Sequence, residues 1–150
     1  MIELYPGEKL DFFSKDDDPY RSYMISNFGR VYSLRTNKFL ILRPNNCGYL
    51  RADIYYKSKT TVFRKQVFIH IEVVKVFGDC VGNKISEQKK YIDIINIDHI
   101  DKNKCNCKQS NLQIVSFSEN QRRKWLTDEE RLKIKQTLLQ DEDFDITSIF

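Results

Sequence analysis

Residues 97–121 read IDHIDKNKCNCKQSNLQIVSFSENQ, and this stretch decides the fold and the function that we predict. It places Asp98 beside His99, and two asparagines, Asn111 and Asn120, follow farther along the chain. Carboxylate and amide oxygens can hold a hard divalent cation. A neutral imidazole can take a proton from water near neutral pH. Together these groups can hydrolyse a phosphodiester bond with one metal ion.

The pattern around these residues predicts two antiparallel strands followed by a helix. Asp93–His99 is typical of a strand, and Asn111–Val115 is its expected partner across a long loop. Ser116-Phe117-Ser118-Glu119 has the S-x-x-E form of a capping box, which predicts a helix that continues to about Trp125. The local order is therefore ββα.

This stretch resembles the core of HNH nucleases, in the variant whose last histidine is replaced by asparagine. The positions that fall on the pattern of that variant are His99, Asp101, Asn111, Leu112, Glu119 and Asn120. Upstream, Tyr23–Leu34 looks like the N-terminal module YxISNxGRVxS that is often joined to these nucleases in phage and mobile-intron endonucleases. Ile69–Phe77 is similar to the H-R-L-V-A-x-x-F helix of the family. The resemblance covers about residues 20–125.

The resemblance implies a role for each polar residue of the site. His99 would be the general base, and Asp98 and Asn120 would be the protein ligands of one cation. Asn111 would brace the hairpin and help to orient His99. A neutral amide ligand favours Mg²⁺ or Mn²⁺ over Zn²⁺. Asp98 could instead be an ordinary charge at a strand end, and Asn111 a simple turn residue.

The loop between the strands departs from the family pattern. Lys102 stands where the family usually has glycine, and Cys105-Asn106-Cys107 keeps only one of two adjacent asparagines. Asp101 is expected to shape this loop. The departures do not affect the four residues with an implied role in the site, which are Asp98, His99, Asn111 and Asn120.

Composition limits the class of protein. The chain has 150 residues, of which 41% are hydrophobic, and this fits one compact domain with small appendages. No apolar run is long enough for a membrane span, and we expect an intracellular, soluble protein that is not secreted. The four cysteines are then expected to be thiols. A structural zinc site is disfavoured because Cys105 and Cys107 form C-x-C, not the usual C-x-x-C.

Charge is concentrated in the middle of the chain. The net charge is +4, but residues 19–126 carry 20 basic and 8 acidic residues, a net +12. A basic surface of this kind binds a polyanion by releasing its counterions, so double-stranded DNA is the expected partner. The basic residues expected to contact DNA are Arg30, Arg35, Lys38, Arg43, Arg51, Lys57, Lys59, Arg64 and Lys65 in the strand region, and Arg122, Arg123 and Lys124 in the helix after Asn120.

The expected fold class is α+β, with four segments. Residues 1–19 form an acidic N-terminal segment, 20–78 a β-rich DNA-contacting module that ends in a helix, 79–126 the ββα-metal core, and 127–150 a helical tail. The expected strands of the second segment are Tyr23–Ile25, Arg30–Leu34, Phe39–Leu42, Tyr49–Tyr56 and Thr61–Phe68, with a hairpin turn about Lys57-Ser58-Lys59. Expected helices are Ile69–Phe77, ending at Gly78, and Thr127–Leu139, capped by Thr127; Phe144–Phe150 resembles the start of another.

Two functions from different classes are open at this point. The first is a metal-dependent, homing-endonuclease-like DNA endonuclease that uses Mg²⁺ or Mn²⁺. The second is a catalytically inactive DNA-binding protein derived from such a nuclease, and a zinc-stapled interaction module is a weaker third. A monomer with one site would nick one strand, whereas a homodimer could cut both; the sequence leaves the oligomeric state open.

Overall fold

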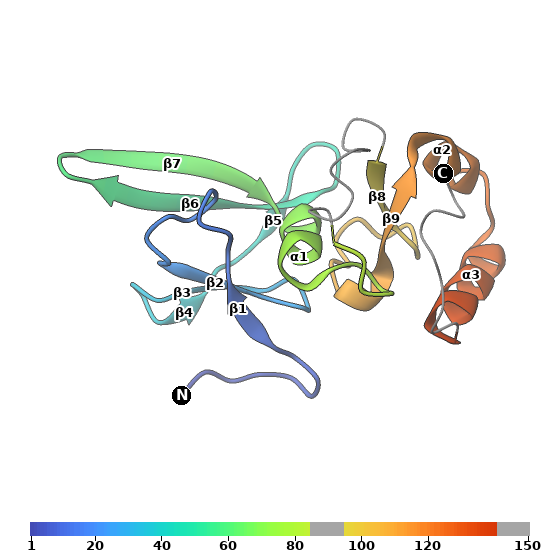
Figure 1. Ribbon diagram of the computed structural model, residues 1–150, viewed down its shortest axis with the longest axis horizontal. Helices are drawn as coiled ribbons and strands as arrows, with labels where there is room; N and C mark the ends of the chain where they lie inside the picture. Colours follow the sequence, from blue (N-terminus) through green and yellow to red (C-terminus); the bar gives the residue numbers. More distant parts are fainter. Residues whose placement is uncertain (85–94, 141–150) are drawn as a thin grey trace.

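The computed structural model describes residues 1–84 and 95–140. These residues form three antiparallel sheets and three α-helices, so the α+β class is confirmed (Figure 1). The elements are β1 (Leu10–Phe12), β2 (Tyr23–Ser26), β3 (Val31–Ser33), β4 (Lys38–Phe39), β5 (Arg43–Pro44), β6 (Leu50–Ser58), β7 (Thr61–Phe68), α1 (Ile69–Phe77), β8 (Ile95–His99), the 3₁₀ turn η2 (Gln109–Asn111), β9 (Leu112–Ser116), α2 (Phe117–Arg123) and α3 (Asp128–Gln140).

The first sheet begins inside the acidic N-terminal segment, residues 1–19. Its strand order is β1-β2-β3-β4, and Leu10 of β1 pairs with Ser26 of β2. Phe13, which follows β1, is buried in the core. The Leu10–Phe13 pattern is short and precedes a run of three aspartates, so the acidic composition concealed it. Residues 1–19 therefore contribute a strand to the module that follows them.

The β6–β7 hairpin is the most extended feature of the molecule and projects away from the other elements (Figure 1). Its register runs from Arg51 opposite Phe68 to Ser58 opposite Thr61. The turn is therefore Lys59-Thr60, slightly later than predicted, and Lys59 has a positive φ of 50°. Such two-residue turns need left-handed backbone because its twist matches that of the strands.

Helix α1 joins the N-terminal sheets to the ββα core. Its residues Ile69 and Val73 are completely buried, together with Ile25 of β2 and Leu112 and Ile114 of β9. The helix ends at Gly78, as predicted, with φ of 88°. One hydrophobic core therefore spans both halves of the chain and fixes their relative position.

Asp79, just after α1, closes the free edge of β9. Its Oδ2 accepts a hydrogen bond from the Ile114 amide at 3.0 Å, and its Oδ1 accepts from the Val81 and Asn83 amides. The next residue, Cys80, donates its amide proton to the Leu112 carbonyl at 2.7 Å. Two backbone groups of β9, the Ile114 amide and the Leu112 carbonyl, are thus paired with the segment after α1.

The ββα order is present as predicted. β8 pairs with β9, and His99 lies opposite Leu112. Asn111 belongs to the 3₁₀ turn before β9, not to the strand itself. The Ser116 hydroxyl accepts a hydrogen bond from the Glu119 amide and so caps α2.

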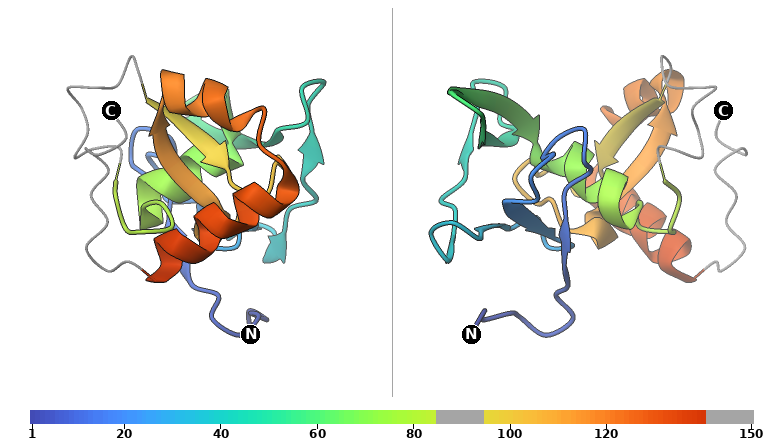
Figure 2. Two further views of the ribbon diagram at one scale, coloured as in Figure 1. Left: turned by 90° about the vertical axis from the view of Figure 1, so that its right-hand side faces the viewer. Right: turned by 60° about the vertical axis from the view of Figure 1, so that its left-hand side comes forward.

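Helix α3 packs across the β8–β9 pair (Figure 2, left). Thr127 and Glu130 form a capping box at its start, because the Thr127 amide donates to the Glu130 carboxylate and the Glu130 amide donates to the Thr127 hydroxyl. The expected start of the first strand at Asp93 and the expected helix at Phe144–Phe150 lie outside the described residues. No helix in the described ranges is long and apolar enough to cross a membrane.

The Glu8–Arg30 pair should make the fold sensitive to acid. Burial raises the pKa of Glu8, but hydrogen bonds from Arg30 and the Tyr5 amide outweigh it and bring this pKa to about 2. A lowered carboxyl pKa contributes stability above pH 4.5 that is lost as the pH falls toward 2. Glu8→Gln should lower the free energy of unfolding by about 1–2 kcal/mol at neutral pH and flatten this acid-induced loss, as measured by urea unfolding.

The control for this prediction is Glu129→Gln. Glu129 and Lys133 form an exposed pair at 3.7 Å, which should contribute little. Equal effects of the two substitutions would contradict the prediction.

Candidate active site

One cavity of about 300 Å³ brings together three residues that the sequence predicted for the site. Asp98 and His99 reach it from the end of β8, and Asn120 reaches it from α2. Neighbouring residues of a strand normally point to opposite faces. Here the strand ends at His99, and both side chains line the cavity. The remaining lining residues are Tyr49, Ile97, Lys102, Lys104, Lys124 and Arg131.

His99 is nearly enclosed by protein atoms, with 5% of its surface exposed. Its ring centre lies 5.0 Å from that of His70 and 5.9 Å from that of Tyr49. Its Nε2 atom lies 3.9 Å from the sulfur of Cys107. Burial lowers the pKa of His99, and the carboxylates of Asp98 and Asp101 oppose this shift. A neutral ring in this position can accept a proton from water.

His70 packs behind His99 and does not line this cavity. Its ring stacks on Tyr49, with centroids 5.0 Å apart and planes inclined by 27°. Burial, with a smaller contribution from His99, lowers the pKa of His70 to about 3. This residue is therefore an uncharged packing partner of Tyr49 and His99.

Two buried arginines hold the carboxylate of Asp98. The Nη1 atom of Arg123 lies 3.1 Å from Oδ2, and the Nη1 atom of Arg131 lies 3.4 Å from Oδ1. Arg131 comes from α3 and also donates to the carbonyls of His99 and Ile100. Asp98 is consequently not an ordinary solvent-exposed charge at a strand end. Its position depends on two helices.

The burial of Arg123 argues against the DNA contact that we predicted for it. Only 3% of its surface is exposed, and it bonds to Asp98, Glu119 and Gln113. On the helix, every third or fourth residue faces the core, and Arg123 occupies such a position while Arg122 and Lys124 face solvent. We therefore assign Arg123 to the support of Asp98.

Asn111 braces the loop that follows His99. Its Oδ1 accepts from the Asp101 amide at 3.2 Å, and its two amide protons go to Asp101 Oδ1 and the Asn106 carbonyl at 2.9 Å each. Its main-chain carbonyl accepts from the amide of Ile100. The hydrogen bonds of the Asn111 side chain are thus all made within the loop that follows His99.

The altered loop keeps a compact shape. Asp101 accepts hydrogen bonds from the Asn103 amide and the Asn106 side chain, both at 2.8 Å. Lys102 adopts φ of 65°, the left-handed conformation that glycine accepts without strain. The loop therefore forms with a lysine at this position, and that lysine lines the cavity.

The donor atoms at the cavity fit a hard cation. A carboxylate from Asp98 and an amide from Asn120 are oxygen ligands, and Mg²⁺ commonly takes few protein ligands and completes its shell with water and phosphate. Within residues 1–84 and 95–140, no group of three or more His, Cys, Asp or Glu residues is arranged to hold a metal.

All four cysteines are free thiols, as predicted.

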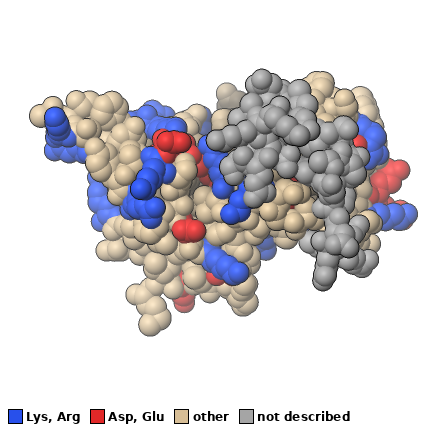
Figure 3. All heavy atoms as spheres, viewed as in Figure 1, with Lys and Arg blue, Asp and Glu red and all other residues tan. Residues whose placement is uncertain are grey.

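The residues expected to contact DNA differ in exposure. Those that are exposed are Arg35, Lys38, Arg43, Arg51, Lys57, Lys59, Arg64, Arg122 and Lys124. Lys65 is partly buried and forms an ion pair with Asp17 at 2.6 Å. Figure 3 shows basic side chains gathered over the half of the molecule formed by the N-terminal sheets. Two of the exposed arginines are paired with carboxylates, Arg64 with Asp53 at 3.2 Å and Arg122 with Glu119 at 2.6 Å.

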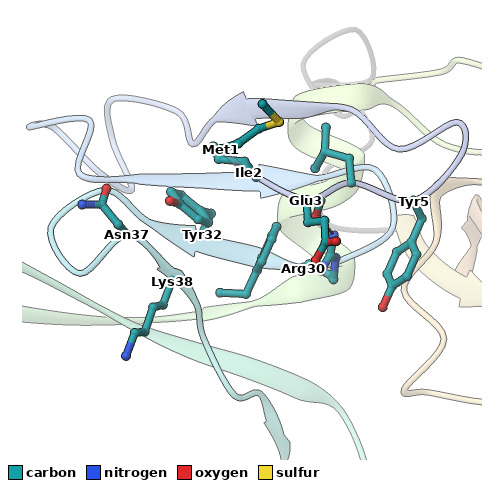
Figure 4. Close-up of a pocket in the computed structure, with 10 residues that line it drawn as sticks. Met1, Ile2, Glu3, Tyr5, Arg30, Tyr32, Asn37 and Lys38 are labelled. Atoms are coloured by element: carbon teal, nitrogen blue, oxygen red, sulfur yellow. Dashed lines mark hydrogen bonds between the residues drawn. The ribbon is translucent and has the colours of Figure 1, made fainter.

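Arg30 lies at the edge of a second cavity, of about 440 Å³, between the N-terminal residues and β3–β4 (Figure 4). Its guanidinium bonds to Glu8 at 2.6 and 2.8 Å and lies 3.7 Å from the ring centre of Phe39. Lys38, by contrast, is exposed and extends away from this cluster. Arg30 therefore fixes the N-terminal residues to the sheet.

Sequence reasoning missed several residues that line the cavity of Asp98, His99 and Asn120. Lys102 and Lys104 follow His99 closely, and this proximity within a basic stretch was a signal that could have identified them. Arg131 lies beyond the end of the motif and Tyr49 lies far before it, and neither carries such a signal. Only the packing of α3, which carries Arg131, and of the segment just before β6, which carries Tyr49, brings them to the cavity.

The chain is similar to HNH endonucleases in sequence and in fold. Residues 9–55 match the NUMOD4 motif family, which covers the predicted N-terminal module. An uncharacterized HNH endonuclease, L247, of Acanthamoeba polyphaga mimivirus is 37% identical over 67% of this chain and 22% of its own length. The H-N-H endonuclease F-TflI of Escherichia phage T5 is 32% identical over 76% of this chain and 52% of its own length.

A second phage T5 relative, F-TflII, is 29% identical over 67% of this chain and 46% of its own length. This chain thus spans about half or less of the length of these relatives. The fold is similar to that of the HNH homing endonuclease I-HmuI, with a TM-score of 0.57 and 24% identity over 85% of this chain and 66% of that one. The chain thus carries a NUMOD4 motif, is similar in sequence to viral and phage HNH endonucleases, and has a fold similar to that of an HNH homing endonuclease.

Proposed function

We propose that this protein is a metal-dependent DNA endonuclease that hydrolyses phosphodiester bonds with Mg²⁺ or Mn²⁺. The observation that carries the proposal is the single cavity lined by Asp98, His99 and Asn120. Three lysines, Lys102, Lys104 and Lys124, line the same cavity and provide positive charge for a phosphate. HNH nucleases generally use divalent metal ions, and I-HmuI binds and cleaves DNA.

His99 is the general base in this proposal. It takes a proton from the water that attacks phosphorus, and the bond to the 3′-oxygen breaks in line with the attack. The rings of His70 and Tyr49 hold the imidazole of His99 in place. Asn111 fixes the loop behind it.

Asp98 and Asn120 would hold the metal ion, which when bound supplies positive charge to the phosphate and the leaving oxygen. Arg123 and Arg131 orient the carboxylate of Asp98 toward this task. Both arginines are buried, so they restrict the movement of the Asp98 carboxylate and do not bind the DNA themselves. The lysines at the cavity would position the backbone of the duplex without reading its sequence.

The proposal is tested with supercoiled plasmid and purified protein. We expect conversion to open circles with Mg²⁺ or Mn²⁺ and no conversion with EDTA. Open circles alone indicate a monomer that nicks, whereas linear products at higher protein concentration indicate paired cuts by a homodimer. An absence of metal-dependent conversion over a range of plasmids and salt concentrations would contradict the proposal.

A catalytically inactive DNA-binding protein is the second candidate. It is favoured by one observation, the pairing of Asp98 with two arginines, because two cations beside a carboxylate weaken its attraction for a metal ion. A gel shift that survives EDTA, with no cleavage in Mn²⁺, would select this function.

DNA binding should respond to salt through the exposed lysines. Lys57→Gln removes an exposed charge on β6, and it should reduce the slope of log K against log salt by about 1. Lys15→Gln removes an exposed lysine from the acidic N-terminal segment and should leave the slope unchanged. Fluorescence anisotropy with a labelled duplex measures both. Equal slopes for Lys57→Gln and the wild type would remove the hairpin from the proposed DNA surface.

A further inference from the structure

The proposed function requires one particular nitrogen of His99 to be free of its proton. A neutral imidazole carries one proton, on either Nδ1 or Nε2, and only the other nitrogen can act as a base. Which nitrogen is protonated depends on the hydrogen bond that the ring makes. The surroundings of Nε2 therefore decide which nitrogen is the base.

Nε2 of His99 contacts a buried thiol. The sulfur of Cys107 lies 3.9 Å from Nε2 and 3.6 Å from the carbonyl oxygen of Lys104. Cys107 is 2% exposed, so bulk water does not replace these contacts. The ring of His99 also packs against His70 and Tyr49, which opposes a flip that would exchange its two nitrogens.

The Cys107 thiol can form hydrogen bonds with both the Lys104 carbonyl and Nε2 of His99 in only one arrangement. Burial, together with Cys105 and Asp101, raises the pKa of Cys107 to about 12, so the thiol keeps its single proton. The carbonyl of Lys104 can only accept a proton, and the Cys107 thiol donates to it. The sulfur then offers a lone pair to Nε2, which must carry the proton of the ring.

We propose that Cys107 is a positioning residue that holds His99 in the tautomer protonated on Nε2, so that the lone pair of Nδ1 is available to water in the cavity. The role of Nδ1 as base rests on the proposed endonuclease function, whereas the tautomer itself does not. In the catalytic cycle Nδ1 gains the proton of the attacking water while Nε2 keeps its own. The chain thus uses a sulfur atom to orient the base.

The chain offers a direct test because it contains only two histidines. Protein labelled with ¹⁵N in its imidazoles should show, by long-range ¹H–¹⁵N NMR at pH 8, a neutral His99 with its proton on Nε2. Cys107→Ala should shift the His99 signals toward the other tautomer. His70→Gln assigns the two rings. A His99 protonated on Nδ1 in the wild type, or an unchanged tautomer in Cys107→Ala, would overturn the inference.

Cleavage provides the second measurement. Cys107→Ala should lower kcat about tenfold with KM unchanged, the scale on which partners of functional histidines act. Cys107→Ser should restore part of kcat, because a hydroxyl can also donate to the Lys104 carbonyl and accept from Nε2. Cys105 lies in the same loop as Cys107, and its exposed thiol contacts the carbonyl of Gly48. Cys105→Ala is therefore the control, and it should leave kcat and the His99 tautomer unchanged.

The NMR and cleavage measurements test the tautomer and the proposed function independently. Wild-type protein that cleaves no DNA would end the proposed function, whereas the NMR spectrum would still decide whether Cys107 fixes the tautomer. Normal cleavage by Cys107→Ala, in a protein whose thermal unfolding is unchanged, would overturn the positioning role.

Discussion

His99→Ala is expected to reduce the rate of metal-dependent plasmid cleavage by about 10²–10⁴-fold, the range that a general base contributes. The residue lies at the end of β8 in the cavity shared with Asp98 and Asn120, and no other imidazole lines this cavity within the described residues. Affinity for DNA measured in EDTA should change little, because the exposed basic residues remain. The measurement is the initial rate of open-circle formation under single-turnover conditions.

The substitution removes a buried side chain, so folding must be checked with it. His99→Asn keeps more of the side-chain volume and should be equally inactive, since an amide does not accept a proton at neutral pH. Far-UV circular dichroism and urea unfolding establish that either variant is folded. A folded variant that retains more than a tenth of wild-type cleavage would exclude His99 as the base.

Gly29→Ala is expected to destabilise the fold by about 2–4 kcal/mol, combining backbone strain with overpacking. Gly29 has φ of 82°, and a Cβ atom there would lie 2.9 Å from Cys107 Cβ and 3.2 Å from the Cys107 carbonyl oxygen. It would also approach Ile69 to 3.3 Å. The turn after β2 thus packs directly on the loop that follows His99, and the free energy of unfolding in urea measures this contact.

Gly82→Ala is the matched control for that prediction. Gly82 has φ of 88°, but a Cβ atom there would meet nothing within 4 Å. It should therefore show only the strain of the left-handed backbone, about 1 kcal/mol. Equal losses for the two variants would show that the close approach of Gly29 to Cys107 contributes nothing to stability.

The sequence was sufficient for most of the local structure. The limits of α1, the cap of α2 and the strands of the hairpin depend on side chains and turns that are close in the chain. The motif spacing placed Asp98, His99 and Asn120 in one site because β8, β9 and α2 are consecutive. The expected strand at Phe39–Leu42 was less accurate, since the structure has only Lys38–Phe39 there.

Local sequence pattern could not predict the N-terminal strand or the contacts of Arg123 and Arg131. Leu10–Phe12 becomes a strand because β2 offers it an edge. Arg122, Arg123 and Lys124 look alike in the sequence, and only the rotation of α2 against β8 buries the middle one beside Asp98. Arg131 reaches the same carboxylate because α3 folds back across the sheet.

The sequence by itself determined the order of the elements and the chemical groups of the site, since both depend on spacing along the chain. Only the tertiary structure decided which charges are buried, which thiol touches the base and how the two modules share a core. Most of those properties arise from contacts between elements that are not adjacent in the sequence, and the hydrophobic core around α1 fixes these elements in space.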